Sequence, residues 1–339
     1  MTSSPYRDTG SDSAMLPSTA APRIEYRKIE RGTALPADVL CAVTFGARAA
    51  VIDDPRSVRV GLAPLTGDGL VEIWHASGAV RRGYDGLVRY TCDDHHLAGA
   101  IEIDESHHGG IAAAAHVAYA AMASFQAAAR FPQVLRVWNY FDAINSGPGD
   151  SERYRQFCVG RTAGLGDALA KPYPAATAIG RRDGDRTLQV YWLAGRNAGR
   201  AVENPRQVSA YLYPRSYSPS PPVFSRAMLV SPELLMISGT ASVVGHSSHH
   251  LGDIRAQLEE TLRNLRSVIQ HAATVAPRLP RELSANSHLK VYLRDPEKLS
   301  LVQDILRTEL PAGVPYVVLA ADVCRANLLI EIDCQHGLS

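Results

Sequence analysis

The sequence has little of what marks several large classes of protein. Its 339 residues include 5 cysteines, odd in number, scattered, and without CxxC spacing. Neither a disulfide framework nor a zinc knuckle follows, and a reducing compartment, the cytoplasm, is expected. The formal net charge is only +1, and no basic run is interleaved with aromatics, which argues against nucleic acid or an anionic membrane as a partner. We identify no apolar stretch long enough to span a bilayer, no Gly-rich nucleotide loop and no GxSxG motif.

The first third of the chain is predicted to be mostly strand. A polar, Ser/Thr/Pro-rich leader at 1–22 lacks the apolar region of a signal peptide and is expected to be disordered. Residues 23–110 contain short apolar or alternating runs, such as VRVGLAPL and LVEIWHA, punctuated by Gly, Asp and Pro. Such runs are typical of a β-rich domain, here the N-terminal one.

From residue 111 onward, helices and strands follow the same order twice. In 111–205 an Ala-rich helix precedes the strand VLRVWNYFDAI, the helix SERYRQFCVGR with Asp150 or Ser151 as N-cap, and two strands. In 206–339 a helix capped by Asp253 precedes a strand, a helix and two strands. The repetition predicts an α+β fold made from a central and a C-terminal copy of one unit, each with two helices on one face of a sheet.

The junction between the two copies, YLYPRSYSPSPPVFSR at 211–226, is too Pro-rich for regular structure. A rigid, aromatic and cationic connector is suited to form a wall for an anionic ligand. From the preceding helix we assign Arg161 to the same site, because it lies near the predicted seam, whereas Arg155 is interpreted as part of an exposed polar face. The candidate ligand-binding residues of the connector are Tyr213, Arg215 and Arg226.

The segment LLIEIDC near the C-terminus carries one acidic residue in an apolar strand. A two-residue period places Leu328, Ile330 and Ile332 on one face and Glu331 on the other. A carboxyl group removed from water favours its protonated form and can act as a general acid. Cys324 lies seven positions earlier, beyond a predicted turn. On residue types alone, an edge strand with an exposed Glu and a space-filling Cys is the more ordinary interpretation.

Several motifs in order carry a family resemblance. ISGTASVVGHSSHHLGDIRAQ, LKVYLRDPE and LLIEID resemble RidA/YjgF-type proteins. VWNYFDAIN, ERYRQFCVGR, YPRSYSPSPPVFSRA, SGTASVVGHSSHH and ADVCRANLLIEID together resemble the chorismatases, which hydrolyse chorismate to pyruvate and a benzoate or a dihydroxycyclohexadiene carboxylate. The likeness covers roughly residues 110–339. It implies a pseudo-threefold arrangement of RidA/YjgF-like (chorismate-mutase-like barrel) domains in one chain, with the β-rich first third as a degenerate copy and the site between the central and C-terminal domains.

The resemblance also implies an activity and residue roles. It implies an enzyme that converts chorismate to pyruvate and 3-hydroxybenzoate, with 4-hydroxybenzoate as a further candidate product, without metal or organic cofactor and as a monomer. Glu331 matches the family's catalytic Glu, and Cys324 matches a position where members that form 3-hydroxybenzoate carry Cys. Gly239 and Ala241 fall where the family tunes the type of product.

Two alternatives stay open at this stage. A RidA-like protein could deaminate enamine/imine intermediates or bind small carboxylates, but the connector favours a chorismatase because short, trimeric RidA-like proteins lack it. The histidines of DDHH, SHH and HSSHH invite a metal site, yet their spacing is not that of HExxH, and exposed or hydrogen-bonding histidines are expected instead.

Overall fold

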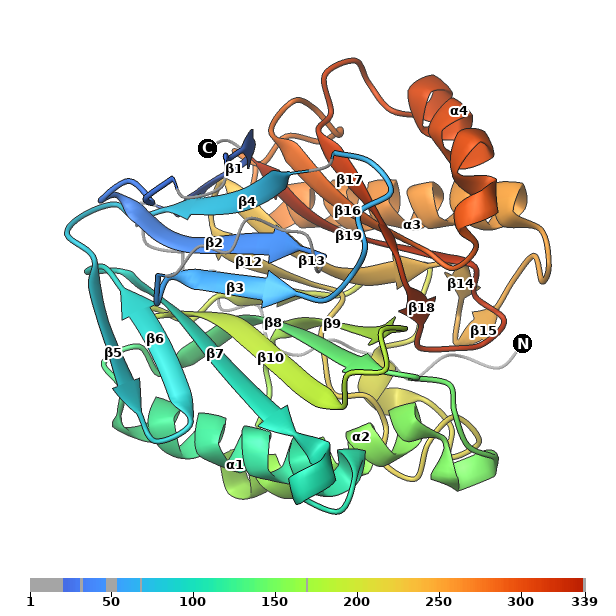
Figure 1. Ribbon diagram of the computed structural model, residues 1–339. Coiled ribbons are helices and arrows are strands. Elements are labelled where there is room, and N and C mark those ends of the chain that lie inside the picture. The colour runs from blue at the N-terminus through green and yellow to red at the C-terminus, as the bar shows by residue number, and fades with distance from the viewer. Residues whose placement is uncertain (1–20, 31–32, 47–53, 68, 169, 338–339) are drawn as a thin grey trace, which may run out of the picture.

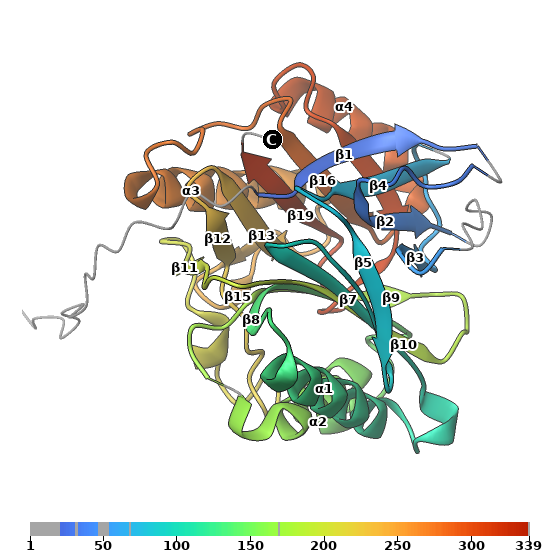
Figure 2. The same ribbon diagram turned by 90° about the vertical axis from the view of Figure 1, so that its left-hand side faces the viewer.

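The computed structural model describes residues 21–30, 33–46, 54–67, 69–168 and 170–337, so the expected leader lies almost wholly outside the described residues. Three sheets surround a common centre, and helices cover the outer faces of two of them (Figures 1 and 2). The N-terminal sheet has the order β1-β4-β2-β3. Its strands are β1 (Arg23–Lys28), β2 (Val39–Phe45), β3 (Ser57–Val60) and β4 (Leu70–His75).

The central sheet has seven strands in the order β18-β9-β8-β10-β7-β6-β5. They are β5 (Arg81–Asp85), β6 (Val88–Cys92), β7 (His96–Asp104), β8 (Gln133–Asp142), β9 (Ala175–Arg181), β10 (Thr187–Gly195) and β18 (Asp322–Val323). Helices α1 (Ile111–Ala128) and α2 (Arg153–Leu165) pack on its outer face. The strands at 81–104, which we expected in the N-terminal domain, therefore pair within the central sheet, and the boundary between sheets falls after β4 instead of at residue 110.

The C-terminal sheet has six strands in the order β11-β12-β13-β19-β16-β17. They are β11 (Arg200–Val202), β12 (Ala227–Ser231), β13 (Leu234–Ala241), β16 (Ser287–Leu293), β17 (Tyr316–Ala320) and β19 (Ile330–Gly337). Helices α3 (Ile254–Val275) and α4 (Leu299–Glu309) cover it, and β14 (Val243–Val244) pairs with β15 (Ser247–Ser248) beside it. Single 3-10 turns lie at Glu105–His107, Gly149–Ser151, Gly166–Ala168, Ala210–Leu212 and Pro296–Lys298.

The two larger sheets repeat one topology. Strands β7, β8, β9 and β10 stand in the same order and orientation as β13, β16, β17 and β19, with a parallel pair, β8/β9 or β16/β17, spanned by the second helix. In the N-terminal sheet β1, β2, β3 and β4 take the same four places, again with a parallel pair, but no helix accompanies them within the described residues. The predicted α+β fold of repeated units, with a reduced first copy, is confirmed.

The units are joined by their edges. After β17 the chain crosses to the central sheet, where Asp322 of β18 pairs with Gly180 of β9, and then returns as β19. Leu319 of the C-terminal unit forms a bridge with Pro64 of the N-terminal unit. A buried core lies between the three sheets, distinct from the cores beneath the helix pairs. The last strands of the chain are therefore held by two units at once.

The helix starts were predicted with mixed success. The side chain of Asp253 accepts a hydrogen bond from the Ala256 amide at 3.1 Å, so the predicted cap of α3 is confirmed. The cap predicted for α2 is wrong, because Asp150 and Ser151 lie in the 3-10 turn before it and Glu152 takes the cap position without a side-chain bond.

Helix α1 corrects a further expectation. It is the one helix among the described residues with the length and hydropathy of a membrane span, although the sequence was interpreted as having none. Its buried residues, including Ala114, Ala118 and Met122, belong to the core between α1, α2 and the central sheet. Small residues allow this close approach to the sheet, and the apolar composition is explained by packing.

Candidate active site

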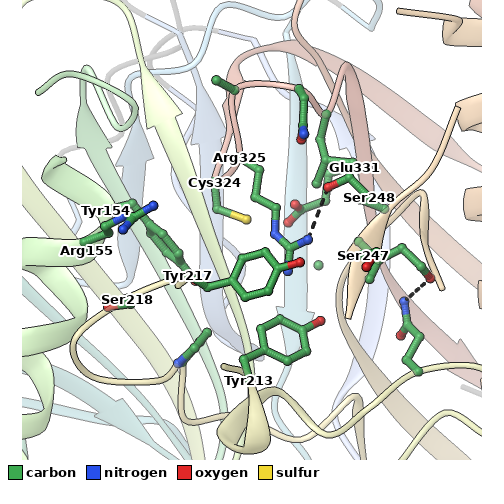
Figure 3. Close-up of a pocket in the computed structure, with 18 of the residues that line it drawn as sticks. Tyr154, Arg155, Tyr213, Tyr217, Ser218, Ser247, Ser248, Cys324, Arg325 and Glu331 are labelled. Carbon is green, nitrogen blue, oxygen red and sulfur yellow. Dashed lines mark hydrogen bonds between the residues drawn. The ribbon is translucent and has the colours of Figure 1, made fainter. Parts of the chain in front are cut away.

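A cavity of about 530 Å³ opens between the central and C-terminal units. One side is formed by α2 with Tyr154 and Arg155, and another by the connector with Tyr213 and Tyr217 (Figure 3). The loop between β18 and β19 and the strands β13 and β19 complete it. This volume suits a small organic ligand. It lies at the seam where the resemblance implies the site.

Glu331 lies on β19 between β13 and β16, in the middle of a sheet and not on its edge. Ile330 and Ile332 face the helices, while Glu331 faces the cavity from the opposite side. Burial, and next the negative charge of Asp333, raise the pKa of Glu331 to about 8. The carboxyl group is therefore protonated at neutral pH. Leu328, expected on the same face as the isoleucines, instead precedes the strand and lines the cavity.

Two small residues of β13 give Glu331 its space. Ala241 is its register partner across the sheet. A Cβ atom added at Gly239 would overlap Oε1 of Glu331, so glycine is required by the close approach of the carboxyl group. Gly239 and Ala241 both line the cavity.

Cys324 also lines the cavity, from the segment that follows β18. The predicted turn is present, with the Leu328 amide donating to the Arg325 carbonyl at 3.0 Å. Cys324 follows β18, which pairs with β9 of the central sheet, so Cys324 and Glu331 approach the cavity from different sheets. Burial, and next the proximity of Glu331, raise the pKa of the Cys324 thiol to about 12. At neutral pH this cysteine is a thiol and not a thiolate.

Arg226 and Tyr213 form part of the cavity wall, as predicted. One guanidinium nitrogen of Arg226 donates to the Tyr213 hydroxyl at 2.6 Å and to the Val208 carbonyl at 2.7 Å. Its Nε is buried without a hydrogen-bond partner among the described residues. Arg226 is thus a fixed cation with remaining donor capacity.

Arg325 is a site residue that the sequence reasoning missed. Its guanidinium lies over the rings of Tyr217 and Tyr213, at 4.1 and 5.2 Å from their centroids. It donates to the His246 carbonyl at 2.9 Å and to the Ser248 hydroxyl at 3.2 Å (Figure 3). A signal was available, since Arg325 directly follows Cys324 in the predicted turn. Stacking between aromatic rings fixes this cation at the cavity.

Arg161 lies behind the cavity instead of in its main wall. It borders a small internal space together with Tyr154, Cys324 and Glu331. The side chain is buried, its guanidinium lies 5.3 Å from the Phe157 ring, and its Nε has no hydrogen-bond partner among the described residues. Burial alone would lower the pKa of Arg161, but the neighbouring Cys158 and Tyr119 raise it, so the group is charged.

The two remaining arginines exchange the roles predicted for them. Arg215 is exposed, pairs with Asp150 at 2.6 Å and does not line the cavity. Its assignment to the site was wrong, because the connector turns its side chain toward α2. Arg155, interpreted as a surface residue, lines the cavity while pairing with Asp150 and Glu152.

Two histidines of HSSHH form side-chain hydrogen bonds, whereas Nδ1 of His96, in DDHH, is buried without a partner among the described residues. Nδ1 of His246 lies 3.1 Å from the Tyr217 hydroxyl, and Nε2 of His250 lies 3.4 Å from Oε2 of Glu260. Among the described residues, no three side chains of His, Cys, Asp or Glu are grouped to hold a metal ion.

Taken together, the fold and the site define an α+β protein of three related units with a protonated carboxyl group and several arginines at one seam. A family model described as chorismatase FkbO/Hyg5-like, N-terminal, matches residues 72–194. A chorismatase of Streptomyces rapamycinicus is 36% identical over 277 residues, which cover 78% of this chain and 82% of the relative. A 3-hydroxybenzoate synthase of Streptomyces hygroscopicus is 32% identical over 289 residues, which cover 81% and 84%.

A solved chorismatase structure aligns with 94% of this chain and 98% of its own, with a TM-score of 0.82 and 31% identity. The chain belongs to the chorismatase family. The resemblance drawn from the motifs is confirmed.

Proposed function

We propose that the protein converts chorismate to pyruvate and 3-hydroxybenzoate. One observation carries the proposal: the protonated carboxyl group of Glu331 faces a cavity whose lining includes two arginines without acidic partners among the described residues, Arg226 and Arg325. Within the described residues Arg226, Arg325 and Arg161 form no ion pair with Asp or Glu. The chain's similarity to a chorismatase and to a 3-hydroxybenzoate synthase supports the same substrate.

The substrate's chemistry matches these groups. Chorismate has two carboxylates and an enol ether, so its site needs fixed cations and one proton donor. Arg226 and Arg325 are exposed to the main cavity and would bind one carboxylate, with Tyr213 and Tyr217 orienting it. Arg161 would attract the other carboxylate from behind the wall. A buried guanidinium without a counter-ion is costly unless a ligand supplies the charge.

The reaction would begin with proton transfer from Glu331. Its proton moves to the methylene carbon of the enol ether, and the electron pair of the double bond forms the new C–H bond. The resulting oxocarbenium ion is stabilised by the Glu331 carboxylate left behind. Chorismate contains the same atoms as pyruvate and 3-hydroxybenzoate together, so this outcome consumes no net water, whereas release of a dihydrodiol consumes one.

Cys324 would decide between these outcomes. It borders the cavity beside Glu331, so its thiol can assist loss of the ring hydroxyl. The high pKa of Cys324 favours action as a neutral thiol over attack as a resident thiolate. We assign Gly239 and Ala241 to shaping the same end of the cavity.

The test is incubation of the purified protein with chorismate, followed by chromatography and mass spectrometry, with Glu331→Gln as the matched control. We expect pyruvate and 3-hydroxybenzoate from the wild type and neither from the control. Turnover of an enamine/imine substrate without any pyruvate from chorismate would favour a RidA-like deaminase instead. Bound but unchanged chorismate would indicate a carboxylate-binding protein.

We further propose that the enzyme acts as a monomer in the cytoplasm and needs neither metal nor organic cofactor. Three related units within one chain supply both sides of the seam, so no second copy is needed to complete the cavity. Activity that survives chelation and a single-chain mass by light scattering are the expected results.

A further inference from the structure

A cluster of buried charges lies at the centre of the molecule, beneath the catalytic seam. Each unit contributes to it: Glu72 from the N-terminal sheet, Arg136 from the central sheet, and Lys290 and Asp333 from the C-terminal sheet. Nζ of Lys290 lies 3.2 Å from Oε2 of Glu72 and 3.8 Å from Oδ1 of Asp333. Arg136 lies 3.4 Å from Oδ2 of Asp333. All four side chains are at most 1% exposed, and two cations balance two anions.

Asp333 is the most heavily bonded member of this cluster. Besides Arg136, its Oδ2 accepts hydrogen bonds from Trp138 at 3.1 Å, Tyr292 at 2.8 Å and Thr177 at 3.2 Å. Three hydrogen-bond donors and the ion pair with Arg136 therefore hold this oxygen of Asp333 in one position.

Glu331 precedes Asp333 by two residues and lies on the same face of β19, about 7 Å away along the strand. It accepts no hydrogen bond from any of the described residues, and the cations of the cluster are already balanced. A second negative charge at this place would find no unpaired cation within the cluster. The charged or titratable groups around Glu331 are Asp333, Arg136 from β8, Arg226, Arg325, Cys324, and Tyr154 and Arg161 from α2.

We infer that Asp333 is a positioning residue for the proposed reaction: it engages Arg136 and leaves Glu331 as the carboxyl group that keeps its proton. Thr177 links this arrangement to the cavity wall. Its hydroxyl donates to Asp333 and accepts from Arg136 at 2.5 Å and from the Gly239 amide at 2.9 Å. Gly239 is the residue against which Glu331 rests. The inference rests on the proposed function in one respect, namely that the proton kept by Glu331 is transferred to chorismate.

The test follows the infrared carbonyl band of the protonated Glu331 carboxyl group, identified by its loss in Glu331→Gln, as pH is raised in the absence of substrate. The wild-type midpoint is expected near pH 8. In Asp333→Asn it should fall by at least about one pH unit, because a like charge is removed and Arg136 is released. In Arg136→Gln it should rise, because a cation is lost.

Glu72→Gln is the matched control, since it removes a buried anion of the same cluster that does not adjoin Glu331. Its midpoint should stay at the wild-type value even if its stability falls. A midpoint that does not move in Asp333→Asn overturns the inference. If Asp333→Asn does not fold, as judged by circular dichroism, Arg136→Gln decides: a rise supports the inference and an unmoved midpoint overturns it. Shifted midpoints in a protein that does not turn over chorismate would refute the proposed reaction alone.

Discussion

The central and C-terminal units share one strand layout but present different side chains to the middle of the molecule. Strand β10 turns Gln189, Tyr191 and Leu193 inward, all uncharged, whereas β19 in the corresponding place turns Glu331 and Asp333 inward. The amide of Gln189 accepts from Arg181 at 3.1 Å and donates to the Arg59 carbonyl at 2.8 Å.

Glu331 differs because it accepts no hydrogen bond from any residue the structure describes. A fully bonded amide holds a structure together, while an unsatisfied protonated acid beside a cavity is free to react. The comparison shows that the repeat supplies the framework, while one strand of one copy carries the carboxyl group to which we assign the chemistry.

The largest expected effect on turnover is that of exchanging Glu and Gln between positions 331 and 189. Glu331→Gln keeps the shape of the side chain and removes the proton donor, so turnover should fall by about 10²- to 10⁴-fold. The reciprocal Gln189→Glu, remote from the cavity, should keep activity close to wild type. Steady-state kinetics of both variants checks the pair. Retention of more than about a tenth of the wild-type rate in Glu331→Gln would remove it from the proton transfer.

The same substitution should raise stability. The pKa of Glu331 is about 8 in the folded protein and 4.5 in the unfolded chain. Between these pH values Glu331 ionises only in the unfolded chain, which favours unfolding more strongly as the pH rises. Gln has no such dependence. At pH 7 Glu331→Gln should therefore be more stable by up to about 3 kcal/mol, and near pH 4 by nothing. Denaturant unfolding at the two pH values measures the difference, and an equal difference at both would contradict it.

A smaller loss of activity is expected when the space beside the Glu331 carboxyl group is reduced. In Gly239→Ala the new methyl group would overlap Oε1 of Glu331 and must displace it. A misplaced donor should lower kcat by about 10²-fold without preventing folding. Gly78→Ala is the matched control, because the nearest atom to its added Cβ is Oδ2 of Asp94 at 3.8 Å. Equal activities of the two variants would show that Glu331 tolerates displacement.

The arginines should affect binding more than chemistry. Arg325→Ala removes a cation of the cavity wall and should raise KM by about 10- to 100-fold, since a charged hydrogen bond to a carboxylate contributes about 1.5–3 kcal/mol. Arg215→Ala, whose residue is exposed and paired with Asp150, should leave KM unchanged. A larger rise in KM for Arg215→Ala than for Arg325→Ala would indicate that the substrate carboxylate binds at the outside of the connector and not in the cavity.

The smallest effect on rate is expected at Cys324. In Cys324→Ala pyruvate release should continue within a few-fold of wild type, while 3-hydroxybenzoate gives way to other products. Cys158→Ala, from a cysteine buried in the core of the central unit, serves as the control for loss of a thiol without a change of product. An unchanged product ratio in Cys324→Ala would show that this cysteine only fills space.

Much of the fold could be predicted because hydrophobic periodicity is local. The order of helices and strands in both units, and the cap at Asp253, followed from the sequence. The division of strands between sheets did not, because the residues of β5 to β7 are equally compatible with pairing to β4, whereas β7 pairs with β10 and β6 pairs with β7. Pairing partners are chosen by long-range contacts that a strand's own residues do not encode.

The candidate site was predictable only in part for the same reason. Glu72, Arg136, Lys290 and Asp333 are also charged residues in apolar strands, and they give the same sequence signal as Glu331. Four of these five charges neutralise one another across three sheets, which no local pattern reveals. The family resemblance selected Glu331 correctly as a cavity residue, whereas Arg325 and Tyr217 were not selected, and their stacking on each other directs both side chains to the cavity.

The most direct measurement is the dependence of kcat/KM for chorismate on pH in the wild-type enzyme. A donor with a pKa of about 8 predicts a constant value through neutral pH and, above pH 8, a tenfold loss for each further pH unit. The residual activity of Glu331→Gln should not show this decline in kcat/KM above pH 8. A decline that begins near pH 5, where an ordinary exposed glutamate ionises, or a rate that stays constant through pH 10, would contradict the account.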